Sequence, residues 1–125
     1  MWPDYFPKQC PPADARQDEL TVFRLVSNCP PVREDFLPTV IEYPHRDFSE
    51  DQICLACGVS VFKNKSDILK KKNRYAPLKA KKIAQGTIQA SDGLVKETGQ
   101  HSHITWWLQT DQPHSAFQEV ADVAG

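Results

Sequence analysis

The segment His101–Leu108, with the sequence His-Ser-His-Ile-Thr-Trp-Trp-Leu, contains the residue types best suited to chemistry. Successive side chains point to opposite faces of a strand, which divides this segment into two sets. The set expected to pack on the core is mostly apolar and comprises Ser102, Ile104, Trp106 and Leu108. The other set combines two imidazoles, a hydroxyl and an indole, from His101, His103, Thr105 and Trp107. An apolar wall beside hydrogen-bonding groups is typical of a ligand pocket, so we predict ligand binding here. The alternative is the exposed polar face of an antiparallel sheet.

The two imidazoles of this segment favour two kinds of site. Histidine titrates near neutral pH, so His101 and His103 could bind a phosphate or act as acid and base. Imidazoles two positions apart on a strand could instead share a metal ion. The third ligand would then come from elsewhere in the chain, and the candidates are His45, His114 and Glu97.

Arg24 is a second candidate, because it lies in a segment of β-forming residues, LTVFRLVS at 20–27, which predicts a strand. Its neighbours on either face of that strand are mostly apolar. A buried guanidinium must be paired with a carboxylate, a phosphate or carbonyl groups. We favour an internal pair with Glu42 or Glu97, and the functional alternative is the phosphate of a ligand.

Four cysteines, at positions 10, 29, 54 and 57, allow three interpretations. The favoured one is free thiols, with Cys54 and Cys57 as small buried apolar residues on one face of a helix. The second is a zinc site formed by Cys54 and Cys57 with Cys10 and Cys29. Zinc is less favoured because structural sites usually pair two Cys-x-x-Cys knuckles. A redox motif is the least favoured, because both thiols fall at the C-terminal end of the predicted helix, where the dipole disfavours a thiolate.

Basic residues are concentrated between Lys63 and Lys82, where nine basic residues occur with one acid, Asp67. The functional interpretation of such a stretch is a surface for phosphate or nucleic acid. We favour the solvated outer face of a helix instead, because stacking on bases uses several aromatic residues and only Tyr75 is present. We therefore expect a small-molecule ligand and do not expect a nucleic-acid partner.

The helices and strands that position these residues can be predicted from the pattern of apolar residues and from capping residues and prolines. An irregular, proline-rich arm is expected over 1–19 and a single domain over 20–125. Strands are predicted at 20–27, 59–62, 82–88, 94–98 and 103–109, with a strand or short helix at 117–123. Helices are predicted at 49–57, capped by Ser49 with Gln52, and at 67–75, capped by Ser66 or Asp67. The prolines at 38 and 44 argue against a regular element in the connection 30–48. The fold class is α+β, with a mixed or mostly antiparallel sheet of about five strands and two main helices.

Composition excludes some classes of protein. The chain has 125 residues and a net charge of −1, so no global field attracts nucleic acid or a membrane surface. Its apolar runs are far shorter than the ~20 residues that cross a bilayer. The first residues, from Met1 onward, have neither the basic nor the apolar region of a secretory signal. We therefore expect a cytoplasmic location and no membrane partner.

The run Cys-Leu-Ala-Cys-Gly-Val-Ser-Val-Phe at 54–62, followed by a helix, a strand and His-Ser-His-Ile-Thr-Trp-Trp, resembles a group of small uncharacterised bacterial proteins over about residues 20–120. The order of elements is also distantly similar to the ADP-ribosyltransferase-like fold. That resemblance implies that Arg24 and Ser60 would hold a nicotinamide dinucleotide (NAD) and that Glu97 would orient the acceptor. The chain departs from the family pattern in two places. Ser60 lies in Val-Ser-Val rather than a Ser-Thr-Ser-like motif, and Val95 stands where a second glutamate or glutamine is expected.

Three hypotheses about function follow. The first is a ligand-binding or enzymatic domain whose ligand carries phosphate, with catalytic candidates Arg24, Ser60, Glu97 and His103. Its pocket would be lined by Arg24, Ser60, His101, His103, Thr105 and Trp107. The second is a non-catalytic interaction module that uses the arm, the long connection or the lysine-rich helix. The third is a small zinc-stabilised domain.

Overall fold

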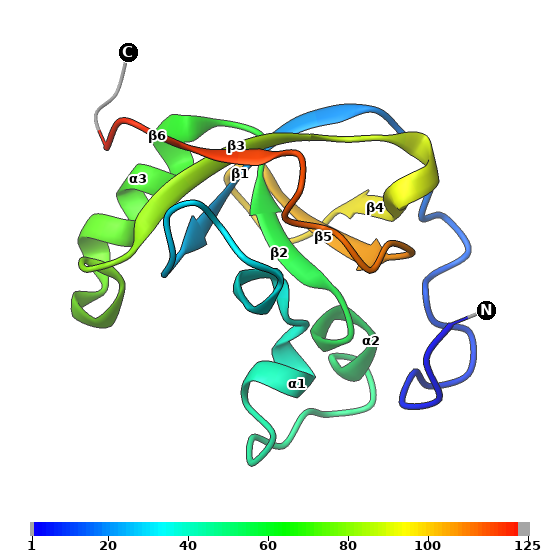
Figure 1. Ribbon diagram of the computed structural model, residues 1–125. Helices are drawn as coiled ribbons and strands as arrows, with labels where there is room; N and C mark the ends of the chain where they lie inside the picture. The colour runs from blue at the N-terminus through cyan, green and yellow to red at the C-terminus, as the bar shows by residue number, and fades with distance from the viewer. Residues whose placement is uncertain (1, 123–125) are drawn as a thin grey trace.

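An antiparallel sheet of six strands forms the centre of the computed structural model, which describes residues 2–122 (Figure 1). The strands are β1 (Leu20–Val26), β2 (Val59–Phe62), β3 (Lys82–Ile88), β4 (Gly93–Glu97), β5 (His103–Leu108) and β6 (Phe117–Val120). Their order across the sheet is β4-β5-β2-β1-β3-β6. The predicted α+β class and antiparallel sheet are confirmed, with one strand more than expected. The segment 117–120 is a strand, whereas residue 123 lies outside the described residues.

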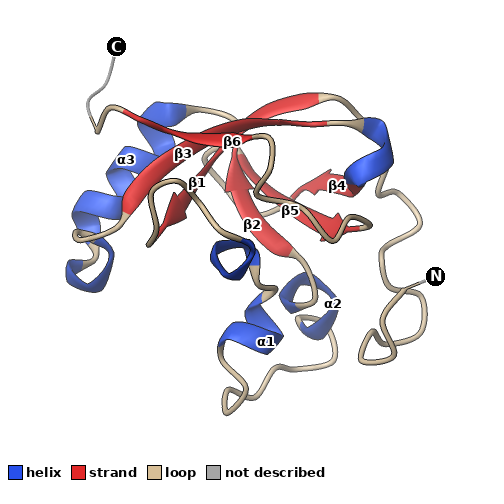
Figure 2. Ribbon diagram, in the orientation of Figure 1, coloured by secondary structure: helices blue, strands red, loops and turns tan. Residues whose placement is uncertain are grey.

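The helices are α1 (Thr39–Glu42), α2 (Ile53–Ala56) and α3 (Lys65–Arg74), with 3-10 turns η1 (Arg33–Phe36), η2 (Ala76–Leu78) and η3 (Ala90–Asp92). Figure 2 shows α3 at one end of the sheet, away from α1, α2 and the N-terminal arm. Across residues 2–122, none of the helices has the length and apolar character that a membrane span requires.

Two predictions about helices were wrong in their details. The helix expected over 49–57 shrinks to α2, because the Ser49 hydroxyl donates to the Asp51 carboxylate and does not cap a helix. The connection 30–48 contains regular elements after all, because Pro38 is the N-cap of α1 and Pro44 follows its C-terminal cap. Proline is tolerated at the start of a helix, so these two prolines flank α1 without interrupting it.

Apolar side chains pack on both faces of the sheet. The larger cluster includes Val22, Val61, Ile104 and Trp106, and Phe36 of η1 covers it. On the opposite face α3 packs Ile68 and Leu69 against Phe62 and Ile83. A third cluster joins Trp107 of β5 to Cys10 and Cys57, with Trp2 and Phe6 of the arm packed against it. The arm, which is irregular as predicted, also pairs with the sheet, because Arg16 and Val95 of β4 exchange two backbone hydrogen bonds.

The sheet opens between β1 and β2. Within the described residues these two strands are in register at a single pair, Phe23 with Phe62, whereas β1 and β3 are paired along their whole length. Beyond that pair the side chain of Arg24 bridges the two strands, since its Nη1 donates to the Ser60 carbonyl oxygen at 2.7 Å. The guanidinium of Arg24 therefore occupies a position between β1 and β2 where a continuous ladder of backbone hydrogen bonds would leave no room for it.

Candidate functional site

The ligand-facing set predicted on β5 divides into an interior half and a surface half. Trp107 is fully buried, and its Nε1 donates to the Cys54 carbonyl oxygen at 2.9 Å. Thr105 is also buried, and its hydroxyl lies 2.7 Å from the hydroxyl of Thr98. Both side chains are therefore enclosed, since the arm and α2 cover Trp107 and Thr98 lies against Thr105, and a ligand contact with them stays a prediction.

The two histidines of the set do reach the surface. His101 is exposed and lies in the turn before β5, with a φ of 58°, so it does not belong to the strand. His103 is partly buried, with its ring edge against Phe62 and its Nδ1 2.9 Å from the Thr98 carbonyl oxygen. With α3 they line a hollow of about 530 Å³, here called the histidine hollow. Its lining residues are Phe62, Asp67, Lys70, Lys71, Arg74, Tyr75, Gly99, Gln100, His101 and His103.

Arg24 lines a second hollow on the other side of Lys71 and Tyr75. This arginine hollow has a volume of about 580 Å³, and Lys71 and Tyr75 contribute to both hollows. Its lining residues are Arg24, Leu25, Thr39, Glu42, Tyr43, Arg46, Ser60, Lys71, Tyr75, Pro77, Leu78 and Lys81. The two hollows together are called the basic groove. The arginine hollow is lined by both Arg24 and Ser60, together with the end of α3.

The guanidinium of Arg24 is held in place by backbone groups. Its Nε donates to the Asp35 carbonyl oxygen at 2.8 Å and its Nη1 to that of Ser60, while its carbon lies 5.7 Å from the centre of the Phe36 ring. The predicted internal ion pair with Glu42 or Glu97 was wrong, because neither carboxylate lies within ion-pair distance among the described residues. Burial lowers the pKa of Arg24, and the negative charges of Glu42 and Asp35 act in the opposite direction.

Positive charge dominates the basic groove although the whole chain has a net charge of −1. The lining contains six cationic side chains, namely Arg24, Arg46, Lys70, Lys71, Arg74 and Lys81, and two acids, Glu42 and Asp67. Within residues 2–122 none of these six cations forms an ion pair. Burial lowers the pKa of Lys71, and the positive charge of Arg24 lowers it further. Two partly buried cations that repel each other form a site where an anion would be stabilised.

The four candidate catalytic residues do not share one hollow. Ser60 contributes its carbonyl oxygen to Arg24, and both lie in the arginine hollow. Glu97 instead forms an exposed ion pair with Lys63, at 3.6 Å, and lies beside His103 in a separate hollow of about 200 Å³. His103 therefore borders Glu97 on one side and the basic groove on the other.

Sequence reasoning missed the cations that make this groove. Lys70, Lys71 and Arg74 were assigned to the solvated face of a helix, and Arg46 was not considered. The spacing of positions 70, 71 and 74 places three cations on one side of α3, which is the signal that could have indicated a surface. What the sequence could not show is that this side faces His103 and Arg24.

The prediction of free thiols is confirmed for Cys29 and for the buried Cys57, and it was wrong for Cys10 and Cys54. Cys10 and Cys54 form a disulfide that joins the arm to α2. Cys57 is buried with a free thiol, and Cys29 is exposed elsewhere on the surface. The four-cysteine zinc site was therefore wrong, and among residues 2–122 no group of three histidine, cysteine or acidic residues is placed to hold a metal ion. Disulfides are typical of oxidising compartments and rare in the cytosol. This bond therefore gives no support to the expected cytoplasmic location, which stays a prediction.

The protonation of His103 should make stability depend on pH. Burial lowers the pKa of His103 below 6.5 and the charge of Lys71 adds to this, while the hydrogen bond to Thr98 acts against it. The unfolded chain then takes up a proton before the folded protein does as the pH falls. We expect the free energy of unfolding to keep its full value above about pH 6.5 and to decrease as the pH falls below it. Denaturation by urea at several pH values should show a weaker decrease in His103→Gln than in the wild type. An identical pH dependence in the two proteins would contradict the prediction.

Comparisons with protein-family models, with curated proteins and with solved structures found no match for this chain.

Proposed function

We propose that the basic groove binds a small anionic ligand that carries a phosphate group, held between Arg24 and Lys71. The observation that carries this proposal is the pair of partly buried cations, neither of which forms an ion pair within the described residues. The partners of the two cations are neutral, namely backbone carbonyl groups for Arg24 and the Phe62 ring for Lys71, so an anion between them would relieve their mutual repulsion. Lys71 and Arg24 would also be the groups whose charge the ligand neutralises.

The chemistry of the lining favours phosphate over a simple carboxylate. The guanidinium of Arg24 is orientated by two backbone carbonyl groups and can donate to the oxygens of a phosphate, so the preference for phosphate depends on the number of cations around it. His103 adds a titratable group at the far end of the groove. Because its Nδ1 bonds to Thr98, its Nε2 is the nitrogen available to a ligand. Several phosphates could be accommodated by six cations, whereas one carboxylate needs far fewer.

The size of the groove and its aromatic residues favour a nucleotide. Each hollow falls within the roughly 300–1,000 Å³ typical of ligand pockets. Tyr75 borders both hollows and is 49% exposed, so its ring is open to stacking. Tyr43 lies in the arginine hollow beneath the guanidinium of Arg46, 4.2 Å from the ring centre. We therefore propose a nucleoside phosphate, and the dinucleotide NAD is one member of that class.

Binding is better supported than catalysis. An ADP-ribosyltransferase-like reaction would need Glu97 close to Arg24 and Ser60, yet Glu97 lies in the small hollow beyond His103. The proposal therefore assigns Arg24, Lys71 and His103 to ligand binding and assigns no reaction.

The test is calorimetric titration with pyrophosphate, ADP, ADP-ribose and NAD at low salt. In Lys71→Gln we expect binding of the best of these probes to weaken by about tenfold to a hundredfold, because a hydrogen bond to a charged group is lost. A bound ligand should also raise the melting temperature of the wild-type protein. Lys71 is a safer first choice than Arg24, whose guanidinium holds two strands together and whose loss could unfold the protein.

The matched control is Lys79→Gln, which removes the same charge from the same basic stretch. Lys79 is exposed and lines neither hollow, so binding should be unchanged within about twofold. Equal weakening in both variants would reduce the effect to nonspecific attraction and overturn the proposal. Failure of all four probes to bind would overturn it as well.

A further inference from the structure

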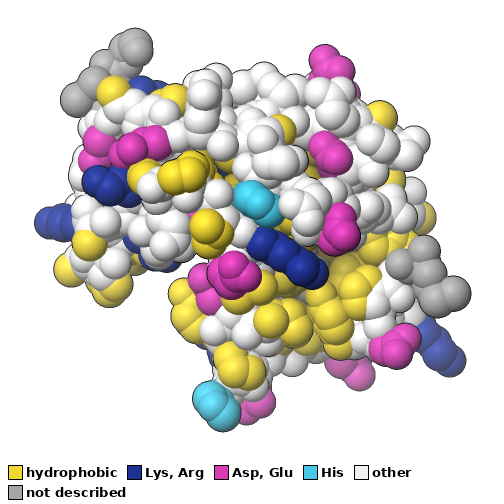
Figure 3. All heavy atoms as spheres, in the orientation of Figure 1, with side chains coloured by type: hydrophobic (Ala, Val, Ile, Leu, Met, Phe, Trp, Pro, Cys, Tyr) yellow, Lys and Arg dark blue, Asp and Glu magenta, His cyan; other side chains and the backbone are white. Residues whose placement is uncertain are grey.

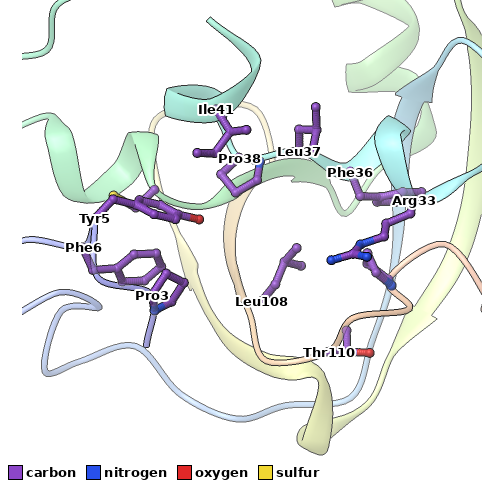
Figure 4. Close-up of a pocket in the computed structure, with 12 residues that line it drawn as sticks. Pro3, Tyr5, Phe6, Arg33, Phe36, Leu37, Pro38, Ile41, Leu108 and Thr110 are labelled. Carbon is purple, nitrogen blue, oxygen red and sulfur yellow. The ribbon is translucent and has the colours of Figure 1, made fainter. Parts of the chain in front are cut away.

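A separate cavity lies between the N-terminal arm, α1 and the end of β5, and it is here called the arm pocket. Its volume is about 280 Å³, and it is lined on one side by Tyr5 and Phe6 of the arm. Ile41 of α1 and Leu108 of β5 complete much of the apolar wall (Figure 4). The pocket shares no lining residue with the basic groove, although α1 contributes Ile41 to one and Glu42 to the other.

The surface around this pocket is unusually apolar. Hydrophobic side chains gather on the face that carries the arm, α1 and α2, and a basic side chain lies at the border of this patch (Figure 3). Tyr5 and Ile41 are each 42% exposed, although both are large and mainly apolar. Exposed apolar side chains that cluster around a cavity are typical of a binding surface.

Two hydrogen-bond donors of the pocket point toward its centre. Figure 4 shows the guanidinium of Arg33 and the hydroxyl of Tyr5 pointing inward from opposite walls. Arg33 is the charged residue of the lining, and within residues 2–122 it forms no ion pair. Burial and the nearby Cys57 raise the pKa of Tyr5, which keeps its hydroxyl protonated as a donor.

From this arrangement we propose that the arm pocket is a second binding site, which takes a small apolar molecule bearing one carboxylate. Arg33 receives the carboxylate in the two-pronged geometry that guanidinium groups form with it, and Tyr5 donates a further hydrogen bond. The apolar part of the ligand lies against Phe6, Ile41 and Leu108. A single cation matches one negative charge, whereas the basic groove offers six cations.

The size of the cavity limits the ligand. Its volume corresponds to about nine waters, at roughly 30 Å³ each, which suits a molecule of roughly ten non-hydrogen atoms. Aromatic or branched short-chain acids fit this limit. A long acyl chain would extend over the exposed side chains of Tyr5 and Ile41.

The experiment compares 3-phenylpropionate with its neutral amide by calorimetric titration. We expect the acid to bind at least about tenfold more tightly than the amide to the wild-type protein. In Arg33→Gln this preference should disappear, while Lys79→Gln should retain it. Equal affinities of the two probes for the wild-type protein, or an unchanged preference in Arg33→Gln, would overturn the proposal.

A second variant tests the apolar wall. Ile41→Glu places a carboxylate at an exposed position of the wall, where folding should tolerate it, and should abolish binding of the acid by repulsion. Normal binding of the acid in this variant would contradict the site. Sedimentation would reveal a dimer that dissociates in Ile41→Glu, and that result would overturn the proposal because a second copy would then cover the patch. Pyrophosphate in excess should not displace the acid, so the two proposed sites can fail separately.

Discussion

Replacing Trp107 by alanine is expected to lower the free energy of unfolding by about 3–5 kcal/mol. The indole is fully buried, packs against Cys10 and Cys57, and bonds to the Cys54 carbonyl oxygen. Its loss would leave a large cavity and remove one of the two hydrogen bonds that the Cys54 carbonyl oxygen accepts, the other coming from the Cys57 N–H. Because small proteins are stable by only about 5–15 kcal/mol, this one change could remove much of the stability. Urea denaturation followed by circular dichroism would measure it.

Two further variants separate the contributions of Trp107. Trp107→Phe keeps an aromatic ring but cannot donate to Cys54, so it should cost about 1–3 kcal/mol. Tyr75→Ala removes an exposed aromatic side chain and should change stability by less than about 0.5 kcal/mol. If Trp107→Ala were as mild as Tyr75→Ala, the indole would have to face solvent or a ligand, which would restore the interpretation made from the sequence.

Removal of the Cys10–Cys54 disulfide is the second change with a large expected effect. The bond joins residues 44 positions apart, for which the loss of chain entropy in the unfolded state corresponds to about 4 kcal/mol. We expect Cys10→Ser/Cys54→Ser to be destabilised by about 2–4 kcal/mol relative to the oxidised protein. Urea denaturation of the wild type with and without dithiothreitol should give the same difference.

The control for this effect is Cys29→Ser, which removes an exposed free thiol. Its stability should differ from the wild type by less than about 0.5 kcal/mol. Dithiothreitol without effect on the wild type, under conditions in which thiol counting shows full reduction, would contradict the prediction. Because the arm carries Tyr5 and Phe6, reduction should also weaken binding in the arm pocket.

The strands could be predicted from the sequence because their patterns are local. The segments 59–62 and 82–88 were placed correctly, and the other strands differ from their predicted bounds by no more than one residue at either end, apart from the last. Alternation also assigned Ile104 and Trp106 to the core correctly. The same alternation could not say what covers the opposite face of β5. That depends on the arm, which has no periodic pattern and docks through a disulfide partner 44 residues away.

The residues of the basic groove also differ in whether local sequence patterns could identify them. Apolar neighbours correctly indicated that Arg24 must find partners, but the partners depend on where β1 and β2 separate, which no local pattern shows. His103 was identified because histidine in a strand is conspicuous, whereas Lys71 was hidden among other lysines. The sequence therefore indicated Arg24 and His103 but not the cations of α3 that line the groove with them. Only the tertiary structure brings α3, β5 and β1 together around it.

The pairing of Arg16 with Val95 has a consequence for self-association. β4 is the last strand on its side of the sheet, and a terminal strand offers unpaired backbone groups to which another chain can add. Arg16 occupies the donor and acceptor of Val95 at the middle of that strand, through bonds of 2.8 and 3.0 Å. The arm thereby caps the border of the sheet, and the disulfide at Cys10 tethers the segment that leads into this cap. An arm that came loose would leave the protein with a strand free to recruit its own copies into aggregates.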